Sequence, residues 1–443
     1  MGAGAAGLSA AFWLRRAGCH PVVLERSTTI AGRAPTHWVD GYGFDTGAGA
    51  IASTGTAVRR LATALGVMEE IILSAVVVGV RTEDGRIHRL ARRRPWSLLS
   101  FDALDATDKR SLLRLAARLA PLLRVVNDDD LSTAAGLDTI TAHEFLATHA
   151  TPAVDDIVLG AFLRGKLLVE PDRVSVVDLL AAIKSFLVAG HLWTHPHGIA
   201  FFLEAAAAGL EVRRNTTVVE VQEYRDRVEL VRTTDDGTTL RESFDGCIVG
   251  VPAPTMLELL PALDPVRRDY LSTLEYSRAL VVGLGVPQAP KEPASVVIRP
   301  VSSGADLSAV GLGHHLAPGR VPPGGGILTG FWMSDWSHRH FDDSDEALVE
   351  ATVDTLASLF LHWSVEPAAW AVGRWPEAMV ASRVGTFAGL RAVARVARSD
   401  RRVHLAGDFG AQTSVNTSVG AGESAAHRLI EVLRGRPGGG RRR

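Results

Sequence analysis

Cysteine and long uncharged apolar stretches are what this sequence has least of. Its 443 residues include two cysteines, Cys19 and Cys247, which stand far apart in the chain. This spacing implies neither a disulfide framework nor a cysteine-based metal cluster. No apolar run reaches the roughly 18 uncharged residues that a membrane-spanning helix needs, and the first residues lack a secretory signal pattern. We therefore expect a cytoplasmic protein without a spanning helix.

An excess of charge of one sign is also missing. The chain has 47 lysines and arginines against 49 aspartates and glutamates, so its formal net charge is −2. Nothing in this balance indicates a nucleic-acid partner. The histidines lack the spacing and carboxylate companions of a metal site, and we expect no metal. The length predicts two or three structural units rather than one small core.

What the sequence does contain is a glycine-rich start. The pattern G-x-G-x-x-G is formed by Gly2, Gly4, Ala5, Ala6 and Gly7. A helical pattern, a short apolar strand at Val22–Leu24 and the acidic residue Glu25 follow. In a dinucleotide fold the glycines let the backbone approach a pyrophosphate at a helix N-terminus, and the acid accepts hydrogen bonds from a ribose. We predict such a site here. The alternative is an ordinary turn between a strand and a helix.

A strand before the first glycine is missing. Dinucleotide folds have a strand at that place, and only Met1 precedes Gly2. Either the numbered chain starts late relative to the natural protein, or its parallel sheet lacks the central strand. We favour the first interpretation, because losing a strand that is buried on both faces would leave the backbone groups of its neighbours unpaired.

The residues after the acid extend this pattern. Arg26 follows at once, and then come Ala31, Gly32, Arg33, Gly47 and Ala48. Arg33 stands where a guanidinium would meet a phosphate. Together with the glycine-rich start, these residues resemble the FAD-binding half of the flavin monoamine oxidase, protoporphyrinogen oxidase and phytoene desaturase superfamily. Members of that superfamily have Gly-Gly-Arg here, and this chain has Ala31 in place of the first glycine. Alanine costs little there unless the position needs a positive φ.

A middle segment and a final segment resemble the same superfamily. From Glu211 to Val251, alternating strands joined by a turn at Asp235-Asp236-Gly237 lead into a buried parallel strand. The resemblance implies that the backbone near Val218 meets the adenine of FAD.

The final segment begins with a strand that ends in Gly407 and Asp408, and a helix of small residues follows. One carboxylate and a row of N–H groups suit an extended polar ligand. The resemblance implies that Asp408 binds the ribityl or phosphate region of FAD. It also implies that the helix start lies under the pyrimidine edge of the flavin, with Val415, Asn416, Thr417 and Val419. A helix N-terminus there would stabilise the negative charge of reduced flavin.

A basic segment lies between positions 86 and 126. Arg110, Arg114 and Arg118 recur every four residues opposite a row of leucines, which predicts an amphipathic helix. Its basic face could lie on an anionic membrane or steer an acidic substrate. We favour the simpler interpretation of a solvated face on a substrate-domain helix. We expect Pro121 to end or kink this helix.

The rest of the chain has the features of a variable substrate half. Residues 274–284 resemble the strand on which amine oxidases carry a lysine near the flavin, but the nearest matching position is Leu280. The chain has only four lysines, Lys109, Lys166, Lys184 and Lys291. Without that lysine, the segment is closer to protoporphyrinogen oxidases and desaturases, as is the tryptophan-containing turn at Arg374–Met379. The tryptophans at 332, 336, 363, 370 and 375 either stack on a planar substrate or belong to the core.

Three residues are candidates for the catalytic site. His195 and His197 precede an apolar helix at Ile199–Ala208, where the superfamily commonly has two glycines. An imidazole near the presumed substrate cavity can act as an acid or a base at neutral pH. Helix capping or simple packing is the alternative role. Arg374 is the third candidate.

The sequence thus predicts an α/β fold, in which a Rossmann-like FAD-binding domain of the glutathione-reductase type is assembled from three segments and accompanied by an α+β substrate domain. We assign residues 1–75, 200–255 and 395–435 to the FAD-binding domain. Residues 76–199 and 256–394 form the substrate domain, and residues 436–443 form a disordered tail.

The predicted function is that of an FAD-dependent oxidoreductase, an oxidase or desaturase that transfers a hydride from an apolar, cyclic or conjugated small molecule to the flavin. No second glycine pattern for a nicotinamide is present, so dioxygen, a quinone or another carrier would accept the electrons. The alternatives are an amine or amino-acid oxidase, a flavin-bound isomerase without net redox change, and an inactive relative. Among the partners, a membrane that the protein contacts peripherally is a further alternative.

Overall fold

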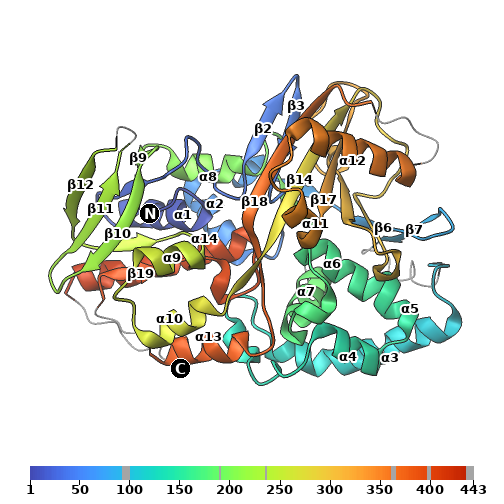
Figure 1. Ribbon diagram of the computed structural model, residues 1–443, viewed down its shortest axis with the longest axis horizontal. Helices are drawn as coiled ribbons and strands as arrows, with labels where there is room; N and C mark the ends of the chain where they lie inside the picture. Colours follow the sequence, from blue (N-terminus) through green and yellow to red (C-terminus); the bar gives the residue numbers. More distant parts are fainter. Residues whose placement is uncertain (92–99, 189–190, 235–236, 361–365, 397–400, 436–443) are drawn as a thin grey trace.

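The structure is a computed structural model that describes residues 1–91, 100–188, 191–234, 237–360, 366–396 and 401–435. It has the predicted α/β class. Figure 1 shows a cofactor part on the left and, on the right, a seven-stranded sheet above a group of helices. The predicted tail at 436–443 lies outside the described residues.

The cofactor part contains two parallel strand pairs. β1 (Val22–Leu24) pairs with β9 (Glu211–Arg213), and β13 (Cys247–Val249) pairs with β19 (Val403–Leu405). The strands are short and mostly apolar, as expected for parallel strands covered by helices. Strands from the first, middle and last segments of the chain are therefore brought together in this part.

The first two residues bridge these strand pairs. Gly2 N donates to Leu24 O at 2.9 Å, which ties the start of the chain to β1. On the other side, the Met1 amino group donates to Ile248 O at 2.7 Å and Gly250 N donates to Met1 O at 2.9 Å. The backbone of Met1 and Gly2 thus lies between β1 and β13, with Gly2 hydrogen-bonded to β1 and Met1 hydrogen-bonded to β13 and to Gly250 just after it.

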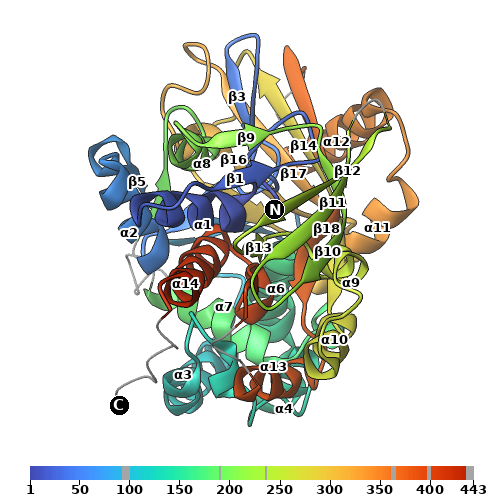
Figure 2. The ribbon, with the colours of Figure 1, turned by 90° about the vertical axis from the view of Figure 1, so that its left-hand side faces the viewer.

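Two helices cover the bridged strands. α1 (Ala5–Arg16) and α14 (Val415–Leu433) lie side by side, as Figure 2 shows. Their backbones approach closely, because a Cβ at Gly422 would be 2.1 Å from Ala6 O. Ser9 Oγ also donates to Val419 O at 2.8 Å. The helix that opens the chain is thus packed against the helix near its end.

A three-stranded antiparallel sheet lies within the middle segment. It consists of β10 (Thr217–Glu223), β11 (Val228–Thr233) and β12 (Thr239–Phe244). The predicted hairpin between β11 and β12 is confirmed, although Asp235 and Asp236 of its turn lie outside the described residues.

The seven-stranded sheet has the order β18-β14-β17-β16-β15-β6-β7, and its neighbours are antiparallel except for β15 and β6. Its strands are β18 (Ala369–Ala381), β14 (Glu275–Val286), β17 (Gly326–Trp332), β16 (Leu307–Leu312), β15 (Val296–Ile298), β6 (Val77–Arg81) and β7 (Ile87–Ala91). The segment Arg374–Met379, expected to be a turn, lies inside β18. β18 stays paired with β14 on both sides of this segment. The turn-like residues are accommodated by a register irregularity, which lies opposite Ser277–Ala279 of β14.

The helices on the substrate side are α3 (Ala106–Val125), α4 (Ala142–His149), α5 (Pro152–Val154), α6 (Gly160–Leu167) and α7 (Val176–Val188). In α3, Leu115 and Leu119 are buried while the three periodic arginines are exposed, which confirms an amphipathic helix. The helix does not end at Pro121 but runs on to Val125. The carbonyl freed by Pro121 belongs to exposed Ala117, where water can satisfy it.

Short strands connect the two parts. The hairpin of β2 (Thr36–Val39) and β3 (Tyr42–Asp45) lies against β14, where Cβ atoms at Gly283 and Gly285 would meet the rings of Phe44 and Tyr42 at 2.7 and 2.6 Å. A second small sheet has the order β4 (Ile51–Ala52), β8 (Leu192–Thr194), β5 (Ile72–Ser74). Residues from both sides of the proposed boundary at 75/76 thus pair with each other.

The remaining α-helices are α2 (Thr56–Leu65), α8 (Ala200–Ala207), α9 (Ala253–Leu259), α10 (Pro265–Ser272), α11 (Ser334–Arg339), α12 (Asp345–Leu359) and α13 (Thr386–Arg395). Across the described residues, we find no helix with the length and apolarity that crossing a bilayer takes.

Candidate active site

A cavity of about 1320 Å³ runs between the cofactor part and the substrate part. This exceeds the roughly 300–1,000 Å³ of a pocket for one ligand, so there is room for a cofactor together with a second molecule. The cavity is lined by nearly all residues predicted to bind the cofactor: Gly2, Gly4, Ala5, Ala6, Glu25, Arg26, Gly32, Arg33, Gly47, Ala48, Val218, Gly407, Asp408, Val415, Asn416 and Thr417.

The two other predicted cofactor residues lie behind this lining. A Cβ at Gly7 would be 1.9 Å from Gly2 O, so this glycine allows α1 to start directly against the first residues. Val419 is 1% exposed and packs in the core beneath the cavity. Both positions therefore shape the cavity wall without lining it.

Two helix N-termini face the cavity. α1 begins at Gly4, which has no side chain to cap the first N–H groups, and the first turn has no acidic residue. α14 begins at Ser414, whose Oγ accepts from Thr417 N at 3.0 Å. Uncapped N–H groups and the positive end of a helix dipole favour an anionic ligand such as a pyrophosphate. The wall at α1 can therefore receive the phosphates of a dinucleotide.

Glu25 is fixed at the end of β1 by two backbone donors. Its Oε2 accepts from Ala3 N at 2.6 Å, and its Oε1 accepts from Ser27 N at 2.9 Å. A carboxylate has about four acceptor sites, so both oxygens can accept a further hydrogen bond from a ribose hydroxyl. The backbone bonds hold the carboxylate in place at the cavity wall.

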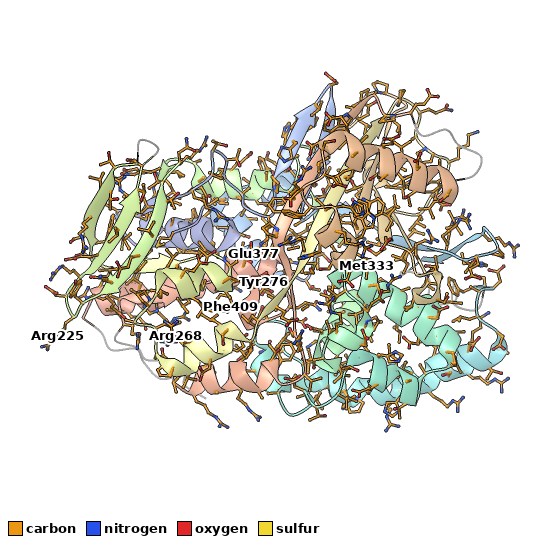
Figure 3. The ribbon with its side chains drawn as sticks, in the orientation of Figure 1. Arg225, Arg268, Tyr276, Met333, Glu377 and Phe409 are labelled. Carbon is orange, nitrogen blue, oxygen red and sulfur yellow. The ribbon has the colours of Figure 1, made fainter. Side chains whose placement is uncertain are left out.

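Arg33 joins the first and last cofactor segments. Its Nη1 lies 3.1 Å from Asp408 Oδ2, and the same nitrogen donates to Glu377 O and Ala378 O. Asp408 is nearly fully buried, and within the described part of the chain no donor is aligned for a hydrogen bond to its Oδ2. Figure 3 shows Tyr276, Glu377 and Phe409 gathered in this region, where β14, β18 and the segment before α14 meet.

The backbone at Ala31 corrects a sequence expectation. Ala31 has φ +78°, and Gly32 has φ +54°. The position does need a positive φ, so the alanine is strained where the superfamily has glycine, by roughly 1–2 kcal/mol for an L-residue. Ala31 N donates to Ala3 O at 2.8 Å, and the methyl group is buried, which holds the residue in this conformation.

Asn416 has a structural task in addition to its place at the cavity. Its Oδ1 accepts from Ala57 N at 3.0 Å and from Val58 N at 3.1 Å. It thereby caps the N-terminus of α2, whose own cap residue Gly55 offers no side chain. The side chain is therefore already engaged by protein groups.

The substrate end of the cavity is mainly apolar. β14 contributes Ala279 and Val281, whose side chains face the cavity. Leu280 points to the opposite face and packs in the core of the sheet. Neither of the two residues of β14 that face the cavity on either side of Leu280 is a lysine. The other apolar lining residues include Val78, Phe162, Leu168, Phe186, Val296, Ile298, Ala309 and Phe331.

A polar group that the sequence analysis missed lies on this apolar wall. Lys166 on α6 and Lys184 on α7 both line the cavity. Lys166 Nζ donates to Gln412 Oε1 at 2.6 Å, and Lys184 Nζ donates to the carbonyl of Val126. The signal in the sequence was a lysine within each of two apolar helix patterns, in a chain with only four lysines.

Burial changes the titration of this group. It lowers the pKa of the Lys166 ammonium to about 8, against the raising effects of Asp178 and Asp128. It raises the pKa of the Asp178 carboxyl to about 7, although Ser382 N donates to that carboxyl. Burial also raises the pKa of Asp128, which lines the cavity, while Lys184 and Lys166 lower it. Of these groups, Lys166 and Asp128 line the cavity, and burial disfavours the charged form of each.

The two candidate histidines lie in a different environment. His195 is 2% exposed and stacks on Phe201 with ring centroids 3.6 Å apart. His197 N donates to His195 Nδ1 at 3.0 Å, and burial lowers the pKa of the His195 imidazolium, against the raising effect of Glu70. Among the described residues that line the cavity, neither histidine is present. Their catalytic assignment stays a prediction.

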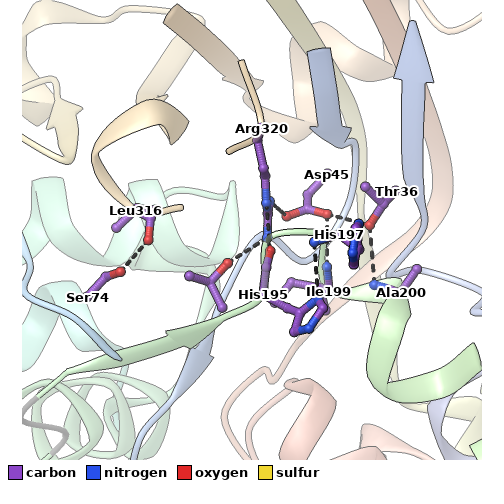
Figure 4. A network of polar contacts seen from close by, with 10 residues as sticks. Thr36, Asp45, Ser74, His195, His197, Ile199, Ala200, Leu316 and Arg320 are labelled. Atoms are coloured by element: carbon purple, nitrogen blue, oxygen red, sulfur yellow. Dashed lines mark hydrogen bonds and ion pairs between the residues drawn. The ribbon is translucent and has the colours of Figure 1, made fainter. Parts of the chain in front are cut away.

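Figure 4 shows what surrounds His195. The buried guanidinium of Arg320 donates to the carbonyl of His195 at 2.9 Å and pairs with the Asp45 carboxylate. Asp45 in turn accepts from Thr36 Oγ1 at 2.7 Å and from Ile199 N at 3.1 Å. This network fixes the segment before α8 to the β2–β3 hairpin, which is a positioning task.

Arg374 lines the cavity, but its guanidinium is engaged elsewhere. It pairs with Asp345 at the start of α12 and donates to Phe341 O at 3.1 Å. Of the tryptophans considered for stacking, Trp375 lines the cavity and donates to Thr46 O, whereas Trp332 and Trp336 stack on each other in the core. Trp363 lies outside the described residues.

The cofactor residues present fit FAD. Three segments line one cavity, and its wall carries two helix N-termini, the Glu25 carboxylate and the buried Asp408. Helix N-termini suit phosphates, and carboxylates suit the hydroxyl groups of a ribose or a ribityl chain. FAD bound there would accept a hydride at its flavin ring. The chain itself would bind and orient the two ends of the cofactor and exclude water from the apolar chamber.

Comparison with known proteins supports this assignment. The family model of flavin-containing amine oxidoreductases matches residues 5–430. Among solved structures, the chain resembles cyclohexylamine oxidase from Brevibacterium oxydans IH-35A, with 20% identity, 98% of each chain covered and a TM-score of 0.77. It also resembles a candidate protoporphyrinogen oxidase from Exiguobacterium sp. 255-15, with 18% identity, 97% of each chain covered and a TM-score of 0.73. A fatty acid isomerase from P. acnes that produces CLA shows 17% identity over 97% of each chain and a TM-score of 0.70. A search of curated protein sequences gave no match.

Proposed function

The chain belongs to the flavin-containing amine oxidoreductase family, and on this basis we propose that it oxidises an apolar small molecule held in the chamber beside the flavin. The family assignment makes it an FAD-dependent oxidoreductase with a small-molecule substrate. The observation that carries the finer proposal is the cavity itself, because the three cofactor segments open directly into a chamber walled by aliphatic and phenyl groups. Such a chamber favours burial of an apolar substrate, cyclic or conjugated ones included.

The electron acceptor in this proposal is dioxygen, a quinone or another carrier. In this proposal the cofactor is bound by residues 1–75, 200–255 and 395–435, and the substrate side is formed by residues 76–199 and 256–394. We also propose a cytoplasmic location. For the exposed arginines of α3 we favour a solvated face, and peripheral contact with an anionic membrane is the alternative.

An amine substrate is supported less well. The strand β14 presents Ala279 and Val281 to the chamber instead of a lysine, although cyclohexylamine oxidase has a similar fold. An isomerase without net redox change is the second candidate, because the P. acnes isomerase shares the fold and an apolar chamber suits a lipid-like substrate.

Anaerobic mixing of the FAD-loaded protein with candidate substrates tests the proposal. Oxidation predicts bleaching of the flavin absorbance at a stoichiometry of one substrate per flavin, and recovery when an acceptor is added. Product formation without an acceptor and without net bleaching would establish the isomerase instead. Ammonia released from amines, with bleaching by amines alone, would establish the amine oxidase.

A further inference from the structure

Two of the four lysines of the chain stand on one wall of an otherwise apolar chamber. The hydrogen-bond partners of their ammonium groups are a side-chain amide, Gln412, and a backbone carbonyl, Val126. Both partners are neutral. An ammonium group has three donors, and each lysine uses one of them in a hydrogen bond to a described residue. Each lysine therefore has donors left for a ligand.

The carboxylates that face these lysines do not neutralise them by direct contact. Asp178 on α7 accepts from Ser382 N, and its burial favours the neutral acid. Asp128 is half-buried on the segment after α3, and both lysines act on its carboxyl. Exposed Asp129 also lines the cavity. Both lysines are half-buried, and no described carboxylate forms an ion pair with either ammonium group. A partly desolvated ammonium group is stabilised by an anion that binds to it.

The apolar surroundings of the two lysines indicate that the rest of the ligand, apart from its anionic group, is a hydrocarbon. Phe162 precedes Lys166 by one helical turn on α6, and its ring packs edge-on against Phe186, with centroids 5.2 Å apart. Gln412 leads into the loop before α14, where its carbonyl accepts from Thr417 Oγ1 at 2.7 Å. The charged end of the chamber thus lies next to the flavin-binding helix start, and phenyl groups adjoin it.

We propose that Lys166, assisted by Lys184, binds the carboxylate of the substrate, so that the substrate is an apolar carboxylic acid whose hydrocarbon part lies along the wall of β14, β15 and β16. This inference rests on the proposed function, since it names the substrate class of the same chamber. Lys166 is the anchor, because it is hydrogen-bonded to the segment that leads into α14.

Calorimetric titration of the full FAD-loaded chain with decanoate, 1-decanol and decylamine at pH 7 tests the inference. The three probes share a hydrocarbon chain and differ in head group. A charge-assisted hydrogen bond contributes about 1.5–3 kcal/mol, so decanoate should bind roughly 10- to 100-fold more tightly than decanol. Lys166→Met should remove this advantage and leave decanol affinity within about threefold. Lys166→Arg should keep it.

The matched control is Lys291→Met, because Lys291 is exposed and is not among the residues lining the cavity. Its decanoate affinity should equal that of the wild type. If Lys166→Met fails to fold, Lys184→Met supplies a second variant, for which a smaller loss of decanoate affinity, about 3- to 10-fold, is expected. Retained FAD absorbance in each variant shows that the fold is intact.

Three results would overturn the inference: decanoate that binds no better than decanol, a decanoate affinity unchanged in Lys166→Met, or decylamine binding that exceeds both and is lost in Asp128→Asn. The last result would place an amine at this wall. Binding that depends on Lys166 without flavin bleaching by the acid would support the carboxylate site while contradicting oxidation of that acid. Bleaching of the flavin by neutral substrates, independent of Lys166, would support oxidation in the chamber while contradicting the carboxylate site.

Discussion

Arg33 and Asp408, from the first and last cofactor segments, form an ion pair with an Nη1 to Oδ2 distance of 3.1 Å. The Asp408 side chain is 2% exposed, whereas that of Arg33 is 30% exposed. The pair therefore leaves the carboxylate dependent on one guanidinium for its charge balance. Arg33 also ties the pair to β18 through the carbonyls of Glu377 and Ala378.

Replacement of Arg33 should destabilise the protein and reduce FAD occupancy. Arg33→Met leaves a buried carboxylate without its partner, which costs about 3 kcal/mol or more. The double variant Arg33→Met/Asp408→Asn should recover most of that loss, because the charge is removed together with its partner. Urea unfolding and the ratio of flavin to protein absorbance measure both effects. Arg225→Met, at an exposed position, serves as the control, and a loss equal to that of Arg33→Met in this control would contradict the prediction.

The strained backbone at Ala31 allows a second prediction. Ala31→Gly removes the strain of a left-handed alanine, roughly 1–2 kcal/mol, but loses a buried methyl group and gains unfolded-state entropy, so the net change should stay within about 1 kcal/mol. Ala31→Val should cost more than about 2 kcal/mol, since a β-branched residue resists this φ and overfills the core. Thermal unfolding of the two variants decides the matter. Equal stability of both would show that the positive φ is not imposed.

The buried carboxyl of Asp178 should make stability depend on pH. Its pKa is raised to about 7 by burial, so between about pH 4 and pH 7 the folded state holds a proton that the unfolded state has lost. Stability from this group is complete at low pH and is lost as the pH rises toward 7. Asp178→Asn should therefore be more stable than the wild type at pH 8, on the order of a few kcal/mol, and the difference should shrink toward pH 4. Chemical unfolding across this range, with exposed Asp172→Asn as control, would show it; a difference that grows toward low pH would refute the assignment.

Binding of a carboxylic acid at Lys166 should weaken as the pH rises. The pKa of Lys166 is lowered to about 8 by burial, against the raising effects of Asp178 and Asp128. The ammonium form, which binds the anion, is present below that pH and is lost above it. Decanoate affinity should stay constant near pH 7 and fall progressively above pH 8, whereas Lys166→Arg should hold its affinity at pH 9, because a guanidinium stays charged there. Titration calorimetry at each pH provides the measurement. A parallel decline in wild type and Lys166→Arg would assign the loss to another group.

The basic face of α3 provides a test of membrane contact. Arg110, Arg114 and Arg118 are exposed, so changing all three to glutamine should alter folding stability by less than about 0.5 kcal/mol each. Each arginine near an anionic surface contributes about 1 kcal/mol, and the triple variant should lose roughly 100-fold in affinity for vesicles of phosphatidylserine and phosphatidylcholine. Co-sedimentation with these vesicles, and with phosphatidylcholine vesicles as control, measures the effect. Absence of wild-type binding would remove the membrane from the proposal.

Much of the cofactor site was predictable because its chemistry depends on fixed local spacing. The glycines at the start of the chain and Glu25 each need only their neighbours in sequence to be interpreted. That the last segment joins them at one cavity came from the resemblance. The conformation of Ala31 was beyond sequence analysis, since a residue type does not reveal the φ imposed by a hydrogen bond to Ala3.

The substrate side was harder to predict because a shift of one residue along a strand moves a side chain from the chamber to the core. In β14 successive side chains face opposite sides, so Leu280 lies in the core of the sheet, whereas its neighbours Ala279 and Val281 face the chamber. The sequence analysis noted Lys166 as one of four lysines but did not locate it at the cavity, because burial of a lysine depends on which helix face the tertiary packing encloses.

The packing of α1 against α14 sets an order of events during protein synthesis. Ser9 donates to Val419, 410 residues further along the chain, so α1 has this partner only after the segment through Val419 has been synthesised. At about 5–20 residues per second, α1 stays without its partner for roughly 20–80 s. FAD capture is then a late step, and the newly made N-terminal helix is a surface that a chaperone would have to shield until the last segment arrives.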